Sequence, residues 1–264
     1  MGTKLANAPV YYTIAQVQFN HILDLDSFVS TIQSKMREVR FLDFKRQMVQ
    51  RLEFPIMGLQ NAQAVPPALT AQTRYMFGDI DGQTAFILDT NSLTLLTTAY
   101  DTFETFSKTF LNGLEIVSSS VRLDLVERIG IRYLDAVHPS ENSESLRDYF
   151  IPEVLGLSQH GHGQLQHSFS ETTVMTTAGQ LISRVFIREG QVGLPNELGE
   201  TPLSINPRFT KYNGLHAIID TDASSVIRIA FDPNEVLHRL SALHEEIANS
   251  FNSIVTDHAR TSWV

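Results

Sequence analysis

The chain has 264 residues, of which 42% are hydrophobic and 19% are charged, and these are the proportions of a folded globular protein. The absence of Cys excludes disulfides, thiolate nucleophiles and Cys-based zinc sites. A formal charge of −9 argues against extended nucleic-acid binding, because such binding depends on many basic side chains that neutralise phosphates.

The first predicted element is a strand at residues 10–20, which are β-branched and aromatic with partial alternation. Asp26 is placed to cap a helix that follows. The apolar residues of that helix recur at helical spacing: Phe28, Ile32, Met36 and Val39. Residues 44–54 alternate between apolar and polar side chains, which predicts a second strand.

Residues 55–71 are predicted to form a loop, since their Pro-Pro pair cannot sit inside a strand ladder. The pair Asp81-Gly82 lies between two apolar runs and is a strong hairpin signal, because both positions must adopt positive φ. Asp101 is placed to cap a second helix. One face of that helix is apolar: Phe103, Phe106, Phe110, Leu114 and Val117. The first half therefore has the order strand, helix, four strands, helix.

The second half is predicted to repeat this order. Residues 126–137 form a strand, and 143–157 form a helix in which Pro152 disturbs the middle or ends a first segment. Asp232-Pro233 starts the last helix, with Pro at its first position. The apolar residues of this helix recur at helical spacing: Val236, Leu240, Leu243, Ile247, Phe251 and Ile254. Four strands are expected between these helices: 163–177, 179–190, 211–221 and 224–231. Asp220 and Asp222 are interpreted as a turn between the last two strands, and the alternative is that they coordinate a cation.

Two stretches of the chain align without gaps: "ILDTNSLTLLTTAYDTFETF" and "IIDTDASSVIRIAFDPNEVL", with Asp89 on Asp220. The alignment predicts an α+β protein built by tandem duplication of a β-α-β4-α unit. The two copies, 1–120 and 121–264, would pack as one pseudo-symmetric unit. Their strands would form a curved antiparallel sheet backed by helices. This architecture is similar to the TATA-binding-protein-like and helix-grip folds, a likeness of fold that carries no function.

Four segments carry a resemblance to a known family: "NAPVYYTIAQVQF", "YMFGDIDGQTAFIL", "RIGIRYLDAV" and "LHEEIANSFNSIVTDHARTSW". They resemble an uncharacterised family of bacterial proteins of similar length, which is sporadically distributed and has a mid-chain R-I-G-[IL]-R-Y motif. The resemblance implies no catalytic residues. It implies a setting, because such a distribution is similar to that of mobile or anti-phage defence genes.

The strand at 126–137 carries the most informative candidate site. Its large apolar side chains alternate toward the helices, so Arg128, Gly130 and Arg132 are expected on the opposite, open face of the sheet. Gly130 would leave room there for a ligand or a partner backbone. The corresponding residues of the first strand are Gln16 and Gln18. The alternative is that the two arginines pair with carboxylates on neighbouring strands.

A basic cluster occurs between residues 34 and 51: Lys35, Arg37, Arg40, Lys45, Arg46 and Arg51. Such a cluster suits an anionic lipid, a nucleic acid or an acidic partner. The alternative is a solvated helix face and strand edge.

A histidine-rich stretch brings His160, His162 and His167 close together in the sequence. Alternating histidines on an extended segment can bind a divalent metal, with Glu171 as a further candidate ligand. The alternative is a Gly-rich connection that leads into a strand.

These patterns favour a non-enzymatic binding protein that recognises another protein, encoded in the same operon, through the open face or an edge of the sheet. We expect a sensor or adaptor of an anti-phage defence system, with no cofactor and with an anionic ligand at Arg128 and Arg132 as a further option. Two alternatives are a metal-dependent hydrolase that uses His160 and His162, and a small-ligand pocket beneath the helices. A homo-oligomer is also open. Without a signal peptide or an apolar run of roughly 18 residues, we expect a cytoplasmic protein that does not span a membrane.

Overall fold

The computed structural model describes residues 7–53, 68–141, 143–161, 163–199 and 201–264, with the backbone alone at 49–53 and 68–72. The strands in this part of the chain are β1 (Val10–Phe19), β2 (Asp43–Glu53), β3 (Ala68–Gly78), β4 (Thr84–Asp89), β5 (Ser92–Thr97), β6 (Leu125–Val137), β7 (His167–Met175), β8 (Gln180–Arg188) and β9 (His216–Ala230). The long helices are α1 (Val29–Glu38), α2 (Phe103–Val121) and α6 (Pro233–Ile254). Shorter helical segments are η1 (Leu25–Phe28), α3 (Leu146–Tyr149), α4 (Pro152–Leu155), η2 (Gly156–Gln159), η3 (Asn196–Leu198), α5 (Pro207–Thr210) and α7 (Asp257–Ser262).

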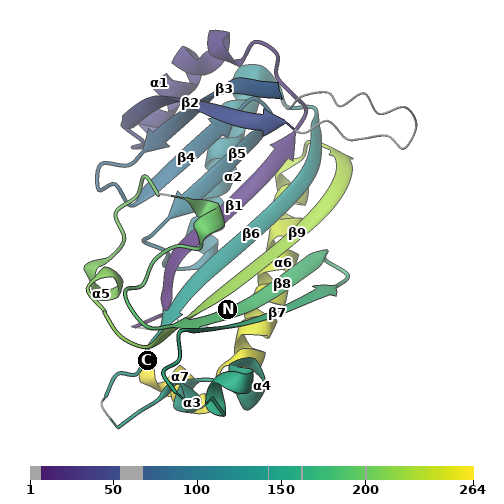
Figure 1. Cartoon of the computed structure of the whole chain (residues 1–264). Helices are drawn as coiled ribbons and strands as arrows, with labels where there is room; N and C mark the ends of the chain where they lie inside the picture. The colour runs from purple at the N-terminus through teal and green to yellow at the C-terminus, as the bar shows by residue number, and fades with distance from the viewer. Residues whose placement is uncertain (1–6, 54–67, 142, 162, 200) are drawn as a thin grey trace.

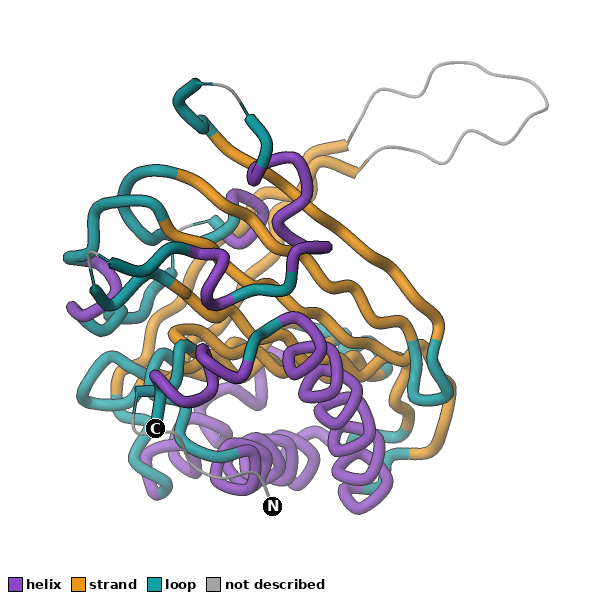
Figure 2. The backbone as a smooth tube through the Cα atoms, turned by 90° about the horizontal axis from the view of Figure 1, so that it is seen from below, coloured by secondary structure: helices purple, strands orange, loops and turns teal. Residues whose placement is uncertain are grey.

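These strands form one antiparallel sheet in the order β2-β3-β4-β5-β1-β6-β9-β8-β7 (Figure 1). The first strands of the two halves, β1 and β6, pair at its centre, where Ala15 lies opposite Ile131. The last strand of each half comes next, with β5 beside β1 and β9 beside β6. The protein is therefore an α+β protein with a large, curved, open antiparallel sheet. The long helices lie on one side of the sheet (Figure 2).

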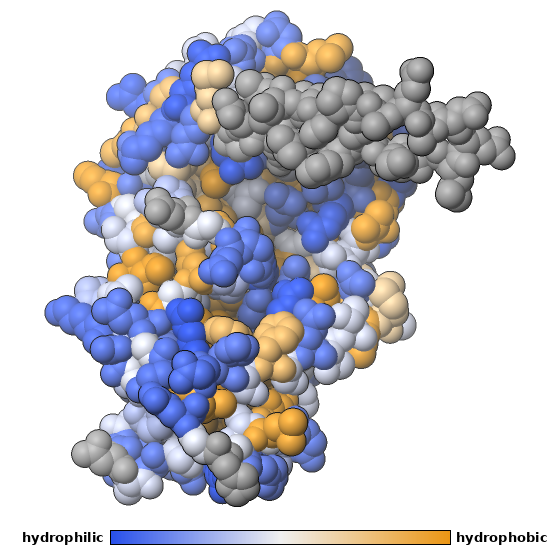
Figure 3. Space-filling model, viewed as in Figure 1, coloured by the Kyte–Doolittle hydropathy of each residue, from blue (hydrophilic) through white to orange (hydrophobic). Residues whose placement is uncertain are grey.

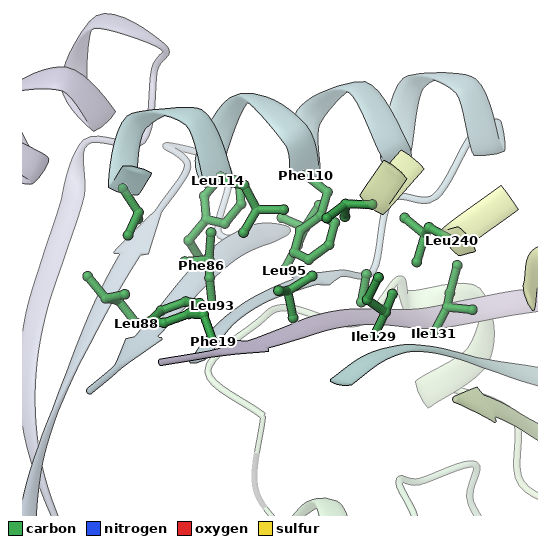
Figure 4. Packing of buried hydrophobic residues seen from close by; sticks show 14 of the residues in the cluster. Phe19, Phe86, Leu88, Leu93, Leu95, Phe110, Leu114, Ile129, Ile131 and Leu240 are labelled. Carbon is green, nitrogen blue, oxygen red and sulfur yellow. The ribbon is translucent and has the colours of Figure 1, made fainter. Parts of the chain in front are cut away.

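The main core lies between this sheet and the long helices. Ile129 and Ile131 of β6 are buried and point toward the helices, as alternation predicts (Figure 4). From the helix side, Phe110 and Leu114 of α2 and Leu240 of α6 are fully buried against the strands. The apolar faces predicted for α2 and α6 are thus confirmed.

Two further apolar clusters stabilise one end of the sheet. On the helix side, Tyr149 and Trp263 belong to a cluster in which α3, α4 and α7 pack against the strand ends. On the opposite face, the described residues of the segment 189–215 cover apolar strand residues such as Leu134, and Phe209 of this segment belongs to the same cluster. The sheet is therefore covered on both faces at this end, and its open face is limited to the other part.

Hydrogen bonds anchor the segment 189–215 to the sheet. The hydroxyl of Tyr11 donates to the backbone oxygen of Gly193 at 2.7 Å. The hydroxyl of Thr98, just after β5, donates to the backbone oxygen of Ser204 at 2.8 Å. These bonds connect the first strand and the fifth strand to a segment that lies far away in the sequence.

The turn predicted at Asp220 and Asp222 is wrong. Residues 216–230 form the single strand β9, which pairs with β6 along one edge and with β8 along the other. The second half therefore has three strands after its first helices, where four were predicted. Asp residues are common in turns, but here cross-strand arginines compensate Asp220 inside a continuous ladder.

The gap-free correspondence of Asp89 with Asp220 is also wrong. The strand that carries Asp89, β4, is separated from β1 by β5, whereas the strand that carries Asp220 pairs directly with β6. The two strands hold different places in the sheet. In the sheet, β9 lies beside β6 as β5 lies beside β1.

The local signals at helix ends are confirmed in part. Asp232 caps α6, but the cap of α2 is Thr102 rather than Asp101. Pro152 starts the short helix α4, so the helix predicted at 143–157 is divided into two. Of the loop predicted at 55–71, the part up to 67 lies outside the described residues, and β3 begins at Ala68. Among the described helices, none has the length and the apolar composition that a membrane crossing needs.

Candidate binding site on the open face of the sheet

A polar strip crosses the open face from β5 to β7. Its members are Thr94, Gln16, Gln18, Arg128, Arg132, Asp220, Asp222, Arg184 and Glu171. The strand register aligns them, because Gln16 lies between Thr94 and Gly130, and Arg132 lies opposite Asp222. Hydrophilic surface is visible in this part of the face in Figure 3. The four residues predicted for the open face all belong to this strip.

Arg132 is held by two carboxylates. Its Nε and Nη2 donate to the two carboxylate oxygens of Asp220, each at 2.6 Å, and Nη2 also donates to Glu197 at 2.6 Å. The side chain of Arg132 is 12% exposed, and that of Asp220 is 5% exposed. Burial by itself lowers the pKa of Arg132, but the hydrogen bonds and charge of Asp220 raise this pKa above its ordinary value. Of the two interpretations of this residue, internal pairing describes its contacts.

The carboxylate of Asp220 also contacts Arg184 of β8. Nη1 of Arg184 lies 3.4 Å from Asp220, and its Nε donates to Glu171 of β7 at 2.6 Å. The sequence alone does not predict this network, because the network depends on the order of the strands. Alternation along β8 is nevertheless a signal that could have placed Arg184 on the open face.

A similar pair occurs in the first half. Nε and Nη2 of Arg74 on β3 donate to the two carboxylate oxygens of Asp89 on β4, at 3.1 and 2.9 Å. The Asp89 side chain is 7% exposed. Each half of the sheet therefore uses a buried aspartate to hold an arginine on the open face.

Arg128 has a different environment. Within the described part of the chain, no carboxylate lies within ion-pair distance of its guanidinium, whose Nη1 donates to the neutral amide oxygen of Gln16 at 3.3 Å. Gln16 in turn donates to the hydroxyl of Thr94 at 2.9 Å. The Arg128 guanidinium lies over Gly130, with atoms 3.1–3.4 Å from the place a Cβ would occupy. The room expected above Gly130 is therefore filled by Arg128 itself.

The predicted basic cluster is divided between α1 and β2. Lys35 donates to the hydroxyls of Ser119 and Ser120 at the end of α2, at 2.9 and 3.2 Å. Lys45 on β2 pairs with Asp43 at 2.7 Å. Arg37 and Arg40 are exposed and Arg46 pairs with Asp26, while the side chain of Arg51 lies outside the described residues. Two of these cations therefore already have carboxylate partners.

The predicted histidine site is described only in part. His160 follows η2, His167 begins β7, and His162 lies outside the described residues. The ring of His167 stacks on Phe186 with centroids 6.1 Å apart. Among the described residues, no group of three His, Asp or Glu side chains is arranged to hold a metal ion.

A second polar group lies beneath the helices, on the other face of the sheet. Thr13, Tyr133 and Thr221 are cross-strand neighbours on β1, β6 and β9. The hydroxyls of Thr13 and Thr221 are buried, and neither has a hydrogen-bond partner among the described residues. Asp135 is also buried, and this burial, followed by the charge of Asp220, raises the pKa of Asp135 to about 7.

The polar strip has the chemistry of a recognition surface. Guanidinium and amide groups donate hydrogen bonds, and a guanidinium can hold a carboxylate with two parallel bonds. In this strip, Arg128 is the arginine whose partner is neutral. No family model matches this chain, and no curated protein sequence matches it.

Proposed function

We propose that the chain is a non-enzymatic binding protein, the sensor or adaptor of a bacterial anti-phage defence operon, and that Arg128 on the open sheet face contacts its partner protein. One observation carries the proposal. On this face, Arg74, Arg132 and Arg184 are each held by a carboxylate, whereas Arg128 is bonded to a neutral amide. Arg128 can therefore bind a carboxylate of a partner protein without breaking an ion pair within its own chain.

The surroundings of Arg128 indicate the chemistry of the partner. Gln16 and Gln18 add amide groups that can bond to a backbone or a polar side chain. Val226 lies opposite Arg128 on β9 and is 83% exposed, so an apolar contact is next to the charge. The site therefore suits an acidic side chain that stands beside an apolar one on the surface of another protein.

The biological part of the proposal has a separate support. The sequence resembles a sporadically distributed bacterial family, and such a distribution is similar to that of mobile or anti-phage defence genes. A sensor or adaptor passes information by binding, so it needs a recognition surface and no catalytic group. The partner is then expected to be a protein encoded in the same operon.

The test is co-purification from the native host, with the chain tagged in its own operon. Wild type should retain a protein from a neighbouring gene, and Arg128→Glu should reduce its recovery at least about tenfold, because a repelled carboxylate costs more than about 1.4 kcal/mol. Arg122→Glu is the matched control, since the Arg122 side chain is 91% exposed at the end of α2. Phage plating on the same strains should follow the same order.

Two outcomes would reject this function. If Arg128→Glu keeps both the partner and the phage protection, the open face is not the recognition surface. If wild type confers no protection against any phage tested and retains no operon product, the defence role is wrong.

A small-ligand site beneath the helices is a second candidate, supported by the unpaired hydroxyls of Thr13 and Thr221. A buried donor without a partner is costly, so a small polar molecule, water included, would be stabilised between them. Native mass spectrometry of the purified protein tests this. An added mass that disappears on denaturation supports an organic ligand, and the bare mass of the chain rejects it.

We also infer that residues 1–120 and 121–264 are two copies of one ancestral unit. The support is the sheet order, in which each half places its first strand at the centre and its last strand beside it. The contact between α2 and α6, which end the two halves, is consistent with this origin. In this version of the duplication, β9 corresponds to β5, and the fold is similar to the TATA-binding-protein-like architecture.

A further inference from the structure

The strand β7 forms one edge of the sheet, and its outer side has no strand partner. In Figure 1, no element is drawn beside this outer edge for most of its length. Alternate residues of an edge strand direct their N–H and C=O groups outward, which makes such a strand a template for another strand. Proteins commonly protect such an edge with Lys, Pro or a bulge.

The sequence of this edge, "HSFSETTVM", contains no Lys, Arg or Pro. Its one acidic residue, Glu171, is already held by Arg184 at 2.6 Å. Three apolar side chains on it are exposed: Phe169 at 56%, Val174 at 43% and Met175 at 76%. The edge is therefore nine residues long and rich in β-branched residues, and its one carboxylate is already paired with Arg184.

We propose that β7 pairs with β7 of a second copy of this chain, antiparallel and around a two-fold axis at Thr172. The sheet would then continue from one subunit into the other. A two-fold dimer is the commonest symmetric assembly, and it requires that one surface be complementary to itself.

The self-complementarity is visible in the register. With the axis at Thr172, Phe169 lies opposite Met175 of the partner subunit on the open face, and this sulfur–aromatic pair forms twice. On the helix face, Ser170 lies opposite Val174 of the partner subunit. Glu171 lies opposite Thr173 of the partner subunit, so no like charges meet and the bond from Arg184 to Glu171 is kept.

Neighbouring registers fit less well. In an antiparallel pair, directly opposite residues lie on the same face of the sheet. The helices of both copies therefore lie on the same side of the joined sheet only if the two-fold axis passes through a residue of β7. An axis at Glu171 would place two carboxylates opposite each other, which is destabilising. An axis at Thr173 would place Met175 opposite Glu171 of the partner subunit and would leave Phe169 without an apolar neighbour on β7.

A groove beside β7 gives the dimer further contact area. It has a volume of about 440 Å³ and lies between β7, β8 and the C-terminal part of α6, with Val174, Leu181 and Ser250 in its lining. Side chains on the helix face of the partner's β7 would point toward the mouth of this groove. The paired strand would thus cover apolar surface as well as satisfy backbone groups.

The first test is sedimentation velocity of the full chain over a dilution series. Wild type should sediment at twice the mass of one chain, and Met175→Lys should be a monomer, because the charge would face the partner's Phe169. The matched control is Met48→Lys, since Met48 is 77% exposed on β2 at the opposite edge. It should remain a dimer. A monomeric wild type, or a dimer lost only in Met48→Lys, would overturn the proposal.

The second test reads the register, and it uses the absence of native Cys. Thr172→Cys would face its own copy at a Cα separation of about 4.5–5.5 Å, within the range of a disulfide. Mild oxidation should therefore give a covalent dimer. Ser170→Cys, on the same face, would lie about 13 Å from its copy along the strand and should not cross-link. A mixture of Ser170→Cys and Val174→Cys should cross-link, and failure of both expected links in a dimeric protein would reject this register.

Discussion

At the scale of single residues, Arg128 and Arg132 lie on the same face of the same strand but have different partners. The difference comes from the residues that the neighbouring strands place beside each of them. Arg132 lies opposite Asp222 and contacts Asp220, whereas Arg128 lies opposite Gln18 and Val226. The sequence predicts the face of each arginine. It does not predict which of them has a carboxylate next to it, because that depends on the order and the register of distant strands.

This difference predicts opposite effects on stability. Arg132→Ala should lower the free energy of unfolding by about 3–5 kcal/mol, because it leaves the buried Asp220 without its main partner. Arg128→Ala should change this free energy by less than about 0.5 kcal/mol, as is usual for a residue without such a partner. Urea denaturation followed by circular dichroism measures both values. Equal losses in the two variants would contradict the assignment of separate roles.

Asp135 predicts a dependence of stability on pH. Its pKa is raised by burial from 3.8 to about 7 in the folded protein. Between these pH values the unfolded chain has lost the proton and the folded chain keeps it, so stability falls as pH rises and is then level above pH 7. The loss of unfolding free energy over this range is on the order of 4 kcal/mol. Asp135→Asn cannot lose a proton and therefore avoids this loss. The variant should be more stable than wild type at pH 8, with little difference at pH 4.

A second buried group makes a control necessary for this measurement. Burial lowers the pKa of His244 from 6.5 to about 4, so its contribution is lost as pH falls through this window. The slopes from His244 and Asp135 oppose each other in wild type. The difference between Asp135→Asn and wild type isolates the aspartate, and Asp124→Asn, with a side chain that is 64% exposed, is the control. A difference that is the same at pH 4 and pH 8 would contradict the prediction.

At the scale of elements, α2 packs tightly against the sheet at Gly113. A Cβ at this position would overlap the ring of Phe86 on β4, which points toward the helix (Figure 4). Gly→Ala inside a helix normally stabilises by about 0.5–1 kcal/mol. Gly113→Ala should instead destabilise by about 1–3 kcal/mol, as overpacking does. Thermal unfolding gives the sign, and a stabilised variant would mean that the Phe86 ring can move aside.

The elements also separate what the sequence predicts from what it leaves open. The buried stripes of α2 and α6 follow from helical spacing, since burying that face is the main source of helix stability. The predicted turn at Asp220 is wrong because cross-strand arginines stabilise this carboxylate inside β9, and their position cannot be deduced from the local sequence. The pairing of Arg184 on β8 with Glu171 on β7 could not be predicted from the local pattern, because it depends on which strands are neighbours.

At the scale of the whole molecule, the two halves share one sheet. The pairing of β1 with β6 extends along most of both strands, and α2 contacts α6. Without the other half, each half would expose an unpaired edge along β1 or β6 and would have an incomplete core. Contacts of this extent usually make a chain unfold in one cooperative step.

This sharing predicts that residues 1–122 do not fold alone. The fragment should lack the near-ultraviolet circular dichroism of packed aromatic side chains, and the full chain should unfold in a single transition. Co-expression with residues 123–264 is the control, because the two fragments together can restore the β1–β6 pairing. A fragment that melts cooperatively by itself would show that the halves are independent domains.

The segment 189–215 is also a site at which the rate of tryptic cleavage can be predicted. It has little regular structure and contains Arg208 and Lys211, which trypsin could cleave if they entered its active site in an extended form. Bonds from Tyr11, Thr98 and Arg132 hold the segment against the sheet, so cleavage must wait for local detachment. The rate of nicking there reports how often one end of the open face is uncovered, and it should rise when the bond from Arg132 to Glu197 is removed.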